Sequence, residues 1–536
     1  MMPAMKLELL HILGFALLAG LIALAGLTLI VARLSHRRPK GPFPESKMQI
    51  APETGRFATA LQDRLAGLET KNAVQLLADP LDALAARLEL IEAAEVSLDL
   101  QYYIWQNDTA GAIMLGALRR AAGRGVHVRL LIDDNGTAGM DRTLAALDEL
   151  PNVEVRLFNP FPIRTARVLG YLSDFRRLNR RMHNKAMIAD GRMAILGGRN
   201  IGDDYFNSLS ESGLYMDLDV AVAGPVLAQI GKQFDLYWNA PPAIPAEKML
   251  GGCKAAEAED IIKDEEVRLS EPEAKRYAVD LRHPDRLSRL LSGKAPVIFA
   301  EAQLIYDHPS KIHGLLQGRK LLWQYLVRAL GQPMQELVLI TPYLVPTRTG
   351  VRYLKRIAKS GAKIKVLTNS YAATDVALVH SGYAHRRKGL LRAGIELYEY
   401  AADAEDRRPN ERNRRERLLG SDIRGTSPFS RNKLHAKVFA VDRARVFIGS
   451  FNFDPRSMRL NTELGIVIAA PEIASEISET FKEFIPTRAW RLRLTRAQQL
   501  RWSRPGHGVR KREPGVPFSH RIFLWVAQRL PIEWML

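Results

Sequence analysis

Residues 181–200 read RMHNKAMIADGRMAILGGRN, and residues 433–452 read KLHAKVFAVDRARVFIGSFN. Both stretches follow one pattern, in which His-x-Lys is followed by an aspartate and then by Gly-x-x-Asn. The histidine and the asparagine are 17 residues apart in each copy, and the copies lie 252 residues apart (435 − 183). Equal spacing at so large a separation indicates that a whole domain is duplicated, not a short repeat.

Each copy predicts a β-hairpin that gathers three side chains. The residues between the lysine and the aspartate are mostly apolar, a turn is expected at the aspartate, and a second apolar run follows. Residues two apart in a strand point to the same face, and the returning strand carries Gly-x-x-Asn back beside them. The gathered side chains are His183, Lys185 and Asn200 in the first copy and His435, Lys437 and Asn452 in the second.

The segments before each motif are duplicated as well. Residues 96–104 and 126–133 are predicted strands, with a helix expected at 109–122 between them. The same order returns at 337–340, 350–359 and 364–368. Strand, helix and strand within roughly 40 residues are typical of a parallel crossover unit. The chain is therefore predicted to contain two similar α/β domains.

Two such clusters facing each other suit phosphoryl transfer. One imidazole can attack phosphorus while the other protonates the leaving oxygen. The two lysines and two asparagines can stabilise charge on the other phosphate oxygens, which elsewhere is the work of a metal ion. No metal-type ligand set accompanies the motifs, so neither a metal nor a cofactor is expected.

From about Leu81 to the C-terminus, the chain resembles the phospholipase D superfamily, whose mark is a pair of HKD motifs. More narrowly, it resembles bacterial cardiolipin synthases with a single N-terminal hydrophobic segment. The stretches that carry this likeness are DLQYYIW (99–105), RLFNPF (156–161), NRRMHNK (179–185), GGRNIG (197–202) and LHAK (434–437). The resemblance implies two domains, each with a mixed sheet flanked by helices, packed about a pseudo-two-fold axis with both motifs at the interface.

The resemblance also implies a two-step reaction through a phosphohistidine, without metal. It makes His183 the nucleophile and His435 the general acid and later the base, although the near-equivalence of the motifs leaves the reverse assignment open. Lys185, Lys437, Asn200 and Asn452 are expected to hold the phosphate. Ser450 stands where the first copy has Gly198, and its hydroxyl is expected to donate to the phosphate as well.

Four acidic residues are expected to support the site. Asp190 and Asp442 end the motif strands and are expected to buttress them. Aligning Pro225 with Pro471 places Asp217 opposite Glu463. The family has an acidic residue near this position that orients histidine, so both carboxylates are candidates for that role.

Composition limits the class of partner. The 536 residues include 77 Lys and Arg against 58 Asp and Glu, a net charge of +19 that favours nucleic acid, acidic lipid or phosphorylated substrates. The single cysteine, Cys253, excludes an internal disulfide and a multi-cysteine metal site. The apolar share of 47% excludes a wholly disordered chain.

Residues 12–32 predict a membrane anchor. They carry no charge, and a helix of this length spans about 30 Å of hydrocarbon. Residues 33–40 hold four basic residues, which places the rest of the chain on the cytoplasmic side. With the family resemblance, this implies the bacterial inner membrane. The alternative is a cleaved signal peptide ending at Ala23-Leu24-Ala25, against which the basic flank argues.

The expected organisation is an anchor (1–40), a linker (41–56), a first phospholipase D-like domain (57–247), a connecting segment (248–285), a second such domain (286–487) and a C-terminal tail (488–536). Residues 403–417 are expected to form a mobile loop. The tail is rich in basic and aromatic residues, which suits a membrane interface or, equally, a cap on the core.

Four functions are compatible with these features. The first is transfer of a phosphatidyl group to phosphatidylglycerol, giving cardiolipin, with phosphatidylglycerol or phosphatidylethanolamine as donor. The others are a hydrolytic phospholipase D, a phosphodiesterase acting on nucleic acid, and a lipid-binding scaffold with a dead site. The anchor favours lipid over nucleic acid as the partner, and two intact motifs argue against a dead site.

Overall fold

A computed structural model describes residues 41–536 except 165, 207–213, 271–296, 316–319, 375, 402–432, 517, 528 and 530–536. Before residue 41 it describes only 18–20, 23, 26, 27 and 39, so most of the predicted anchor lies outside the described residues. Among the residues that are described, no helix is both long and apolar enough to cross a membrane. The loop expected at 403–417 also lies outside them.

The first half is a mixed sheet with the strand order β9-β4-β3-β2-β5-β6-β8-β1, in which β2, β3 and β4 are parallel. Its strands are β1 (Asn72–Leu77), β2 (Ser97–Ile104), β3 (His127–Gly136), β4 (Val153–Phe158), β5 (Ala186–Ala189), β6 (Met193–Gly197), β8 (Asp219–Ala223) and β9 (Ala243–Pro245). Its helices are α2 (Arg56–Leu65), α3 (Pro80–Ala93), α4 (Thr109–Gly123), α5 (Asp141–Asp148), α6 (Arg167–Leu178), α7 (Asp203–Phe206), α8 (Leu227–Trp238), α9 (Ala246–Leu250) and α10 (Ala255–Ser270).

The second half repeats this order as β18-β13-β12-β11-β15-β16-β17-β10, with β11, β12 and β13 parallel. Its strands are β10 (Ile298–Tyr306), β11 (Glu336–Ile340), β12 (Lys363–Asn369), β13 (Glu396–Tyr400), β15 (Val438–Val441), β16 (Arg445–Gly449), β17 (Leu464–Ala469), β18 (Ala489–Leu494), β19 (Leu500–Arg504) and β20 (Gly508–Arg510). Its helices are η1 (Pro309–His313), α13 (Leu322–Leu330), α14 (Arg348–Lys359), α15 (Ala377–Ala384), α16 (Arg387–Leu391), α18 (Pro455–Arg459), α19 (Pro471–Glu483), α20 (Ile485–Arg488) and α21 (Phe518–Ala527).

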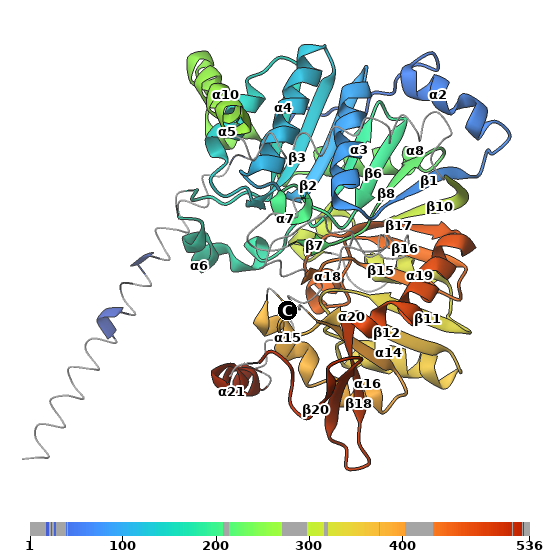
Figure 1. The fold of residues 1–536 in the computed structure, drawn as a ribbon. Coiled ribbons are helices and arrows are strands. Elements are labelled where there is room, and N and C mark those ends of the chain that lie inside the picture. The colour runs from blue at the N-terminus through green and yellow to red at the C-terminus, as the bar shows by residue number, and fades with distance from the viewer. Residues whose placement is uncertain are drawn as a thin grey trace, which may run out of the picture.

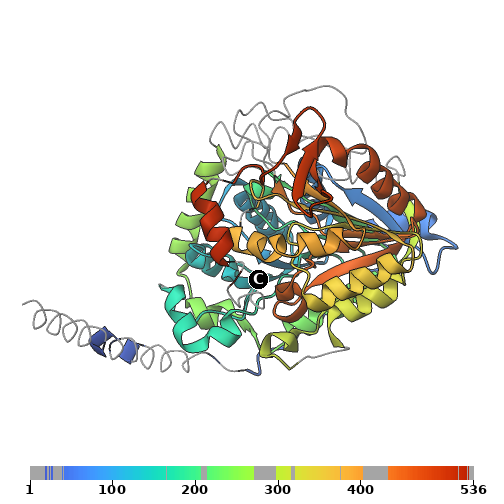
Figure 2. The ribbon, with the colours of Figure 1, turned by 90° about the horizontal axis from the view of Figure 1, so that it is seen from below.

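The two halves join edge to edge. Strand β1 pairs with β10 in the antiparallel sense, which joins the two halves into one 18-stranded sheet (Figure 1). A pseudo-two-fold axis at that junction relates the two halves. Helices lie on both sides of this sheet (Figure 2). One apolar core is shared by the halves and includes Phe234 of α8 and Phe481 of α19, while each half has its own core on the opposite face.

The predicted crossover units are confirmed in both halves, as β2-α4-β3 and β11-α14-β12. The predicted hairpins are also present, because β5 pairs with β6 and β15 with β16 in the antiparallel sense. The motif histidines and lysines, however, lie just before β5 and β15 rather than within them. Since Ile340 pairs with Val438, the lysine before β15 lies at the carboxyl end of β11, where parallel sheets commonly place ligand sites.

Two segments that lie outside the predicted domain limits pack against the domains. The linker lies against the first half, where the N–H of Met48 donates to Asp235 Oδ1 over 2.9 Å. The tail continues the second sheet, because β18 pairs with β13. Trp490 and Trp502 are buried in the second core, so the aromatic residues of this part of the tail cap the core.

Asp190 and Asp442 end the motif strands in the same way. Asp190 accepts hydrogen bonds from three successive N–H groups, those of residues 95, 96 and 97, over 2.7–2.9 Å. Asp442 accepts them from residues 334, 335 and 336 over the same range. Each carboxylate thus ties a motif hairpin to the start of the neighbouring strand, β2 or β11, and substitution tests whether these contacts have the buttressing role predicted from the sequence.

Replacing Asp190 with alanine is expected to lower the free energy of unfolding by about 2–4 kcal/mol, because three N–H groups lose a charged acceptor. Asp442→Ala should behave alike. Urea unfolding followed by tryptophan fluorescence measures the change. The control is Glu53→Ala, which removes a largely exposed partner of Arg192 near the same turn and should leave the midpoint unchanged. Unchanged midpoints in both aspartate variants would contradict the buttressing role.

Candidate active site

Each motif histidine is bound through its backbone to the opposite half of the molecule. The N–H of His183 donates to the carbonyl of Thr462 over 2.9 Å, and the N–H of His435 donates to the carbonyl of Met216 over 2.7 Å. Before His435, the short strand β14 (Lys433–Leu434) pairs in parallel with β7 (Tyr215–Met216) of the first half. The halves therefore interlock at the two histidines.

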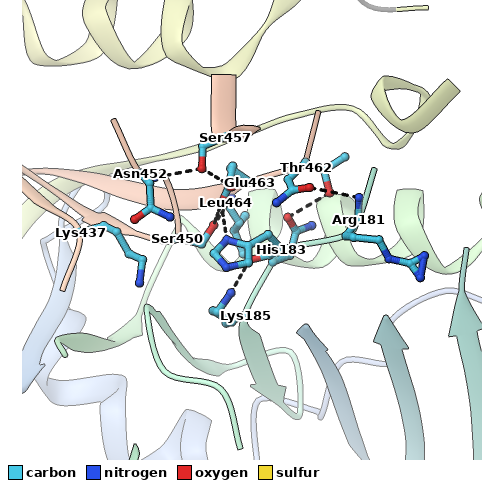
Figure 3. A network of polar contacts seen from close by, with 12 residues as sticks. Arg181, His183, Lys185, Lys437, Ser450, Asn452, Ser457, Thr462, Glu463 and Leu464 are labelled. Atoms are coloured by element: carbon cyan, nitrogen blue, oxygen red, sulfur yellow. Dashed lines mark hydrogen bonds and ion pairs between the residues drawn. The ribbon is translucent and has the colours of Figure 1, made fainter. Parts of the chain in front are cut away.

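Each imidazole is oriented by a carboxylate that belongs to the opposite half. Nδ1 of His183 lies 2.8 Å from Glu463 Oε2, and Nδ1 of His435 lies 2.5 Å from Asp217 Oδ2. Figure 3 shows the first of these contacts. Both carboxylates and both histidines are buried. With Nδ1 held by a carboxylate, Nε2 of each ring is the atom left for chemistry.

Each motif lysine contacts the histidine of its own motif. Nζ of Lys185 donates to the His183 carbonyl over 2.8 Å. Nζ of Lys437 lies 2.7 Å from His435 Nδ1, 3.1 Å from its Nε2 and 4.0 Å from Asp217 Oδ2. Burial lowers the pKa of His183 well below its usual value, and the charges of Lys185 and Lys437 lower it further. The influence of the second-motif lysine on the first-motif histidine agrees with the contacts that join each imidazole to the opposite half, and together they indicate one shared site.

The two carboxylates differ in their electrostatics. Burial alone would raise the pKa of Asp217, but Lys437 and His435 overcome that effect and hold the pKa well below its usual value. For Glu463 burial wins and raises the pKa to about 7, although Lys185 and two serine hydrogen bonds oppose it. His435 therefore faces an ionised partner, while the partner of His183 titrates near neutrality.

Comparison with known proteins places this site in a family. The family described as "Cardiolipin synthase, PLD-like domain" matches residues 88–238 and 326–485 of this chain. Cardiolipin synthase C of Escherichia coli (strain K12) is 44% identical over 460 residues, which are 85% of this chain and 94% of that protein. The chain belongs to the PLD-like cardiolipin synthase family.

More distant relatives agree in sequence or in fold. A cardiolipin synthase of Staphylococcus aureus (strain Mu50) is 21% identical over 484 residues, which are 90% of this chain and 81% of that protein. The crystal structure of phosphatidylserine synthase from Haemophilus influenzae Rd KW20 covers 90% of this chain and 100% of its own, with a TM-score of 0.56 and 15% identity. That likeness shows that the fold is shared. The resemblance stated from the sequence is confirmed.

In this PLD-like chain the half-sites differ at Gly198 and Ser450. A Cβ at Gly198 would stand only 2.1 Å from Asp217 Oδ1, so the first half has no room for a side chain there. Oγ of Ser450 instead donates to Glu463 Oε2 over 2.5 Å and accepts from the N–H of Leu464 over 3.0 Å. The hydroxyl expected to contact phosphate is thus committed to the carboxylate that orients His183.

The two motif asparagines differ as well. Oδ1 of Asn200 accepts from the N–H of Ile104 over 3.1 Å, and its Nδ2 donates to the Tyr205 hydroxyl over 2.7 Å. Oδ1 of Asn452 is buried, and no described residue donates to it. The side chain of Asn200 is therefore held by the protein at both ends of its amide, whereas Oδ1 of Asn452 has no such contact among the described residues.

Several neighbours were not predicted from the sequence. Tyr103 packs edge-on against His183 with ring centroids 5.0 Å apart, and Tyr205 and Tyr215 lie 5.3 and 5.0 Å from His435. Oγ of Ser457 donates to Glu463 Oε1 over 2.7 Å. The aromatic pair in DLQYYIW was the one available signal for Tyr103, since nothing in the motif spacing points to the other three residues.

Glu463→Gln is expected to stabilise the substrate-free protein at pH 8. The native pKa of about 7 lies above the ordinary value of 4.5, so stability is lost as the pH rises from about 4.5 to about 7. Glutamine stays neutral and avoids that loss, which is on the order of 3 kcal/mol. Thermal melting at pH 5 and pH 8 measures the stability difference between the variant and the wild-type protein, and this difference should be small at pH 5.

Asp217→Asn is the matched variant, and its effect on the stability of the folded protein should be opposite in sign. The pKa of Asp217 is held low, so its carboxylate stabilises the folded state above the unfolded pKa, and the amide should destabilise the protein at pH 8. Shifts of the same sign in both variants would contradict the electrostatic difference between the half-sites.

Proposed function

We propose that this protein is a phosphatidyltransferase that transfers a phosphatidyl group to phosphatidylglycerol, forming cardiolipin through a phosphohistidine. One observation carries the proposal: two imidazoles from motifs 252 residues apart meet in one buried site, each oriented by a carboxylate of the other half. Membership of the family and the 44% identity to cardiolipin synthase C support the choice of reaction.

In the first step, Nε2 of His183 attacks the phosphorus of a donor phospholipid. The bond from phosphorus to the headgroup oxygen breaks, and Nε2–H of His435 gives its proton to the departing alcohol. His183 suits the nucleophile because its lowered pKa keeps the ring neutral. Glu463 accepts from Nδ1 and stabilises the positive charge that develops on the ring.

Lys437 couples the binding of substrate to the protonation of His435, the general acid. In the free site its ammonium lies against the His435 ring, and after burial it is the main cause that lowers the pKa of that ring. An anionic phosphodiester attracts this ammonium away from the ring. His435 is then left beside ionised Asp217, which favours its protonated form. The acid is thereby prepared when a donor is bound.

In the second step, the hydroxyl of phosphatidylglycerol enters where the alcohol left. Nε2 of His435 removes its proton, the oxygen attacks phosphorus, and the bond from phosphorus to His183 Nε2 breaks. Lys185, Lys437 and Asn452 hold the non-bridging phosphate oxygens in both steps. Burial of the rings beneath the three tyrosines limits access of water, so that an alcohol can compete as acceptor.

The same proposal includes an anchor at residues 12–32 in the bacterial inner membrane, with the two domains on its cytoplasmic side. Both substrates are lipids, and an anchored enzyme meets them in two dimensions. The domain limits proposed from the sequence are kept, except that residues 489–510 extend the second domain because their strands continue its sheet.

Purified protein in mixed micelles with labelled phosphatidylglycerol should yield labelled cardiolipin. His183→Ala and His435→Ala should each lower turnover by about 1,000-fold or more, because each removes a reacting group. His127→Ala is the control, since His127 contacts Glu154 on the outer part of the first half. Release of phosphatidic acid alone would indicate a hydrolase, and cleavage of DNA without action on lipid would indicate a nuclease.

A donor with a p-nitrophenolate leaving group separates the two histidines. This group departs without a proton, so His435→Ala should still release one equivalent in a burst and then stall, because no base activates the acceptor. The phosphoryl group should remain on His183, which mass spectrometry of the peptide detects. His183→Ala should give no burst. The reverse pattern would make His435 the nucleophile.

A further inference from the structure

Helix α21, near the C-terminus, presents a row of large apolar side chains to solvent. Phe518 is 76% exposed, Ile522 57%, Trp525 58% and Val526 44%. Their spacing of four, three and one residues places them on one face of the helix. Soluble surfaces seldom show such a row without a partner.

The opposite side of α21 is fixed to the second domain. Leu524 is buried, and α21 packs on α15. Just before the helix, Glu513 makes a 2.9 Å ion pair with Arg387 and lies 2.6 Å from His380 Nε2. The apolar face is therefore held in a defined direction, rather than carried on a loose tail.

Helix α21 lies on the rim of the sheet that bears the active site. His520 of α21 contacts the Tyr371 hydroxyl through Nδ1 over 2.6 Å, and Tyr371 follows the carboxyl end of β12. At that end, Nδ2 of Asn369 donates to the carbonyl of Leu434 over 2.9 Å, and Leu434 directly precedes His435. Two short links thus join the helix to the second catalytic motif. Figure 1 shows α21 beside α15 at this side of the second half.

The surroundings of the apolar face are basic. The turn at Arg510–Arg512 is exposed and carries three consecutive cations, and residues 514–532 contain no acidic residue. The guanidinium of Arg529 lies 3.7 Å from the centroid of the Trp525 ring. Aromatic and aliphatic side chains bordered by cations are the composition of a helix that lies in the surface of an anionic bilayer.

We propose that α21 inserts this apolar face into the headgroup region of an anionic membrane, so that the active-site rim meets the lipid surface. The lipid nature of the substrate rests on the proposed function, whereas the surface itself follows from the exposed side chains and their charges. A second copy of the chain, or its own N-terminal apolar segment, would cover the face by protein contact instead.

The test uses the single cysteine of the full chain. In a Cys253→Ser background, Ile522→Cys carries a fluorophore, and Val267→Cys on α10, with a 64% exposed parent side chain, carries it as the matched control. Both proteins are reconstituted in vesicles of phosphatidylcholine with or without phosphatidylglycerol, containing nitroxide-labelled lipid. Lipid quenching should be several-fold stronger at position 522 than at 267, and stronger with phosphatidylglycerol.

A blue-shifted but unquenched label at position 522 would mean that protein covers the face, and an unshifted label would mean that nothing does. Either result would overturn the proposal. Quenching needs no turnover, so a membrane-bound helix in a protein that makes no cardiolipin would refute the proposed function alone.

Phe518→Ser, Ile522→Ser and Trp525→Ser combined leave the buried side of α21 unchanged. Activity on vesicles at limiting lipid should fall about tenfold, because apolar area that binds the surface is lost. The kcat at saturating substrate in detergent micelles should stay at the wild-type value. Equal losses in both assays would indicate a structural role for these side chains and count against the proposal.

Discussion

The catalytic centre depends on hydrogen bonds that cross between the two halves. Glu463 belongs to the second half and orients the histidine of the first, while Asp217 does the reverse. The backbone of each histidine is bound to the residue that precedes the opposite carboxylate. Neither half contains a complete unit of imidazole and carboxylate. The shared core and the β1–β10 junction are therefore conditions for assembling the candidate active site as well as for stability.

These contacts between the halves also give two similar domains two different pairs of histidine and carboxylate. Asp217 is short, lies against the backbone of Gly198, and stays ionised beside Lys437. Glu463 is one methylene longer, receives the hydroxyls of Ser450 and Ser457, and titrates near neutrality. A two-step transfer needs a neutral nucleophile and a separate proton donor. In the proposed mechanism, the difference between the two carboxylates would provide both from a duplicated motif.

Local patterns in the sequence predicted most of the fold. The crossover units and hairpins follow from alternation of apolar residues and from breaks at Gly125 and Gly361, whose φ angles of +94° and +99° suit glycine. Strand β18 was missed because nine basic residues in residues 488–512 masked its alternation, although Trp490 and Leu492 point into the core. A short strand gives little sequence signal when the residues that alternate with its buried side chains are charged and the flanking residues are charged as well.

The sequence indicated which residues form the site, but not which of them contact one another. Equal spacing singled out the histidines and lysines, and alignment of Pro225 with Pro471 found both carboxylates. Nothing local indicates that Glu463 pairs with a histidine 280 residues away, or that the Ser450 hydroxyl is used by a carboxylate. Those contacts depend on how the halves pack, which residue spacing within one half does not encode.

The asymmetry extends beyond the catalytic side chains. A symmetric site would accept a phosphodiester in either direction, because exchanging the two histidines would give an equal complex. Among the described residues, β19, β20 and α21 extend the second half without counterparts in the first, and α21 is linked through Tyr371 to the end of β12 where Asn369 contacts Leu434. The unequal carboxylates and the unequal rim both distinguish His435 from His183. Under the proposed function, a donor with one lipid arm and one small headgroup would therefore meet different neighbours in its two possible directions of binding.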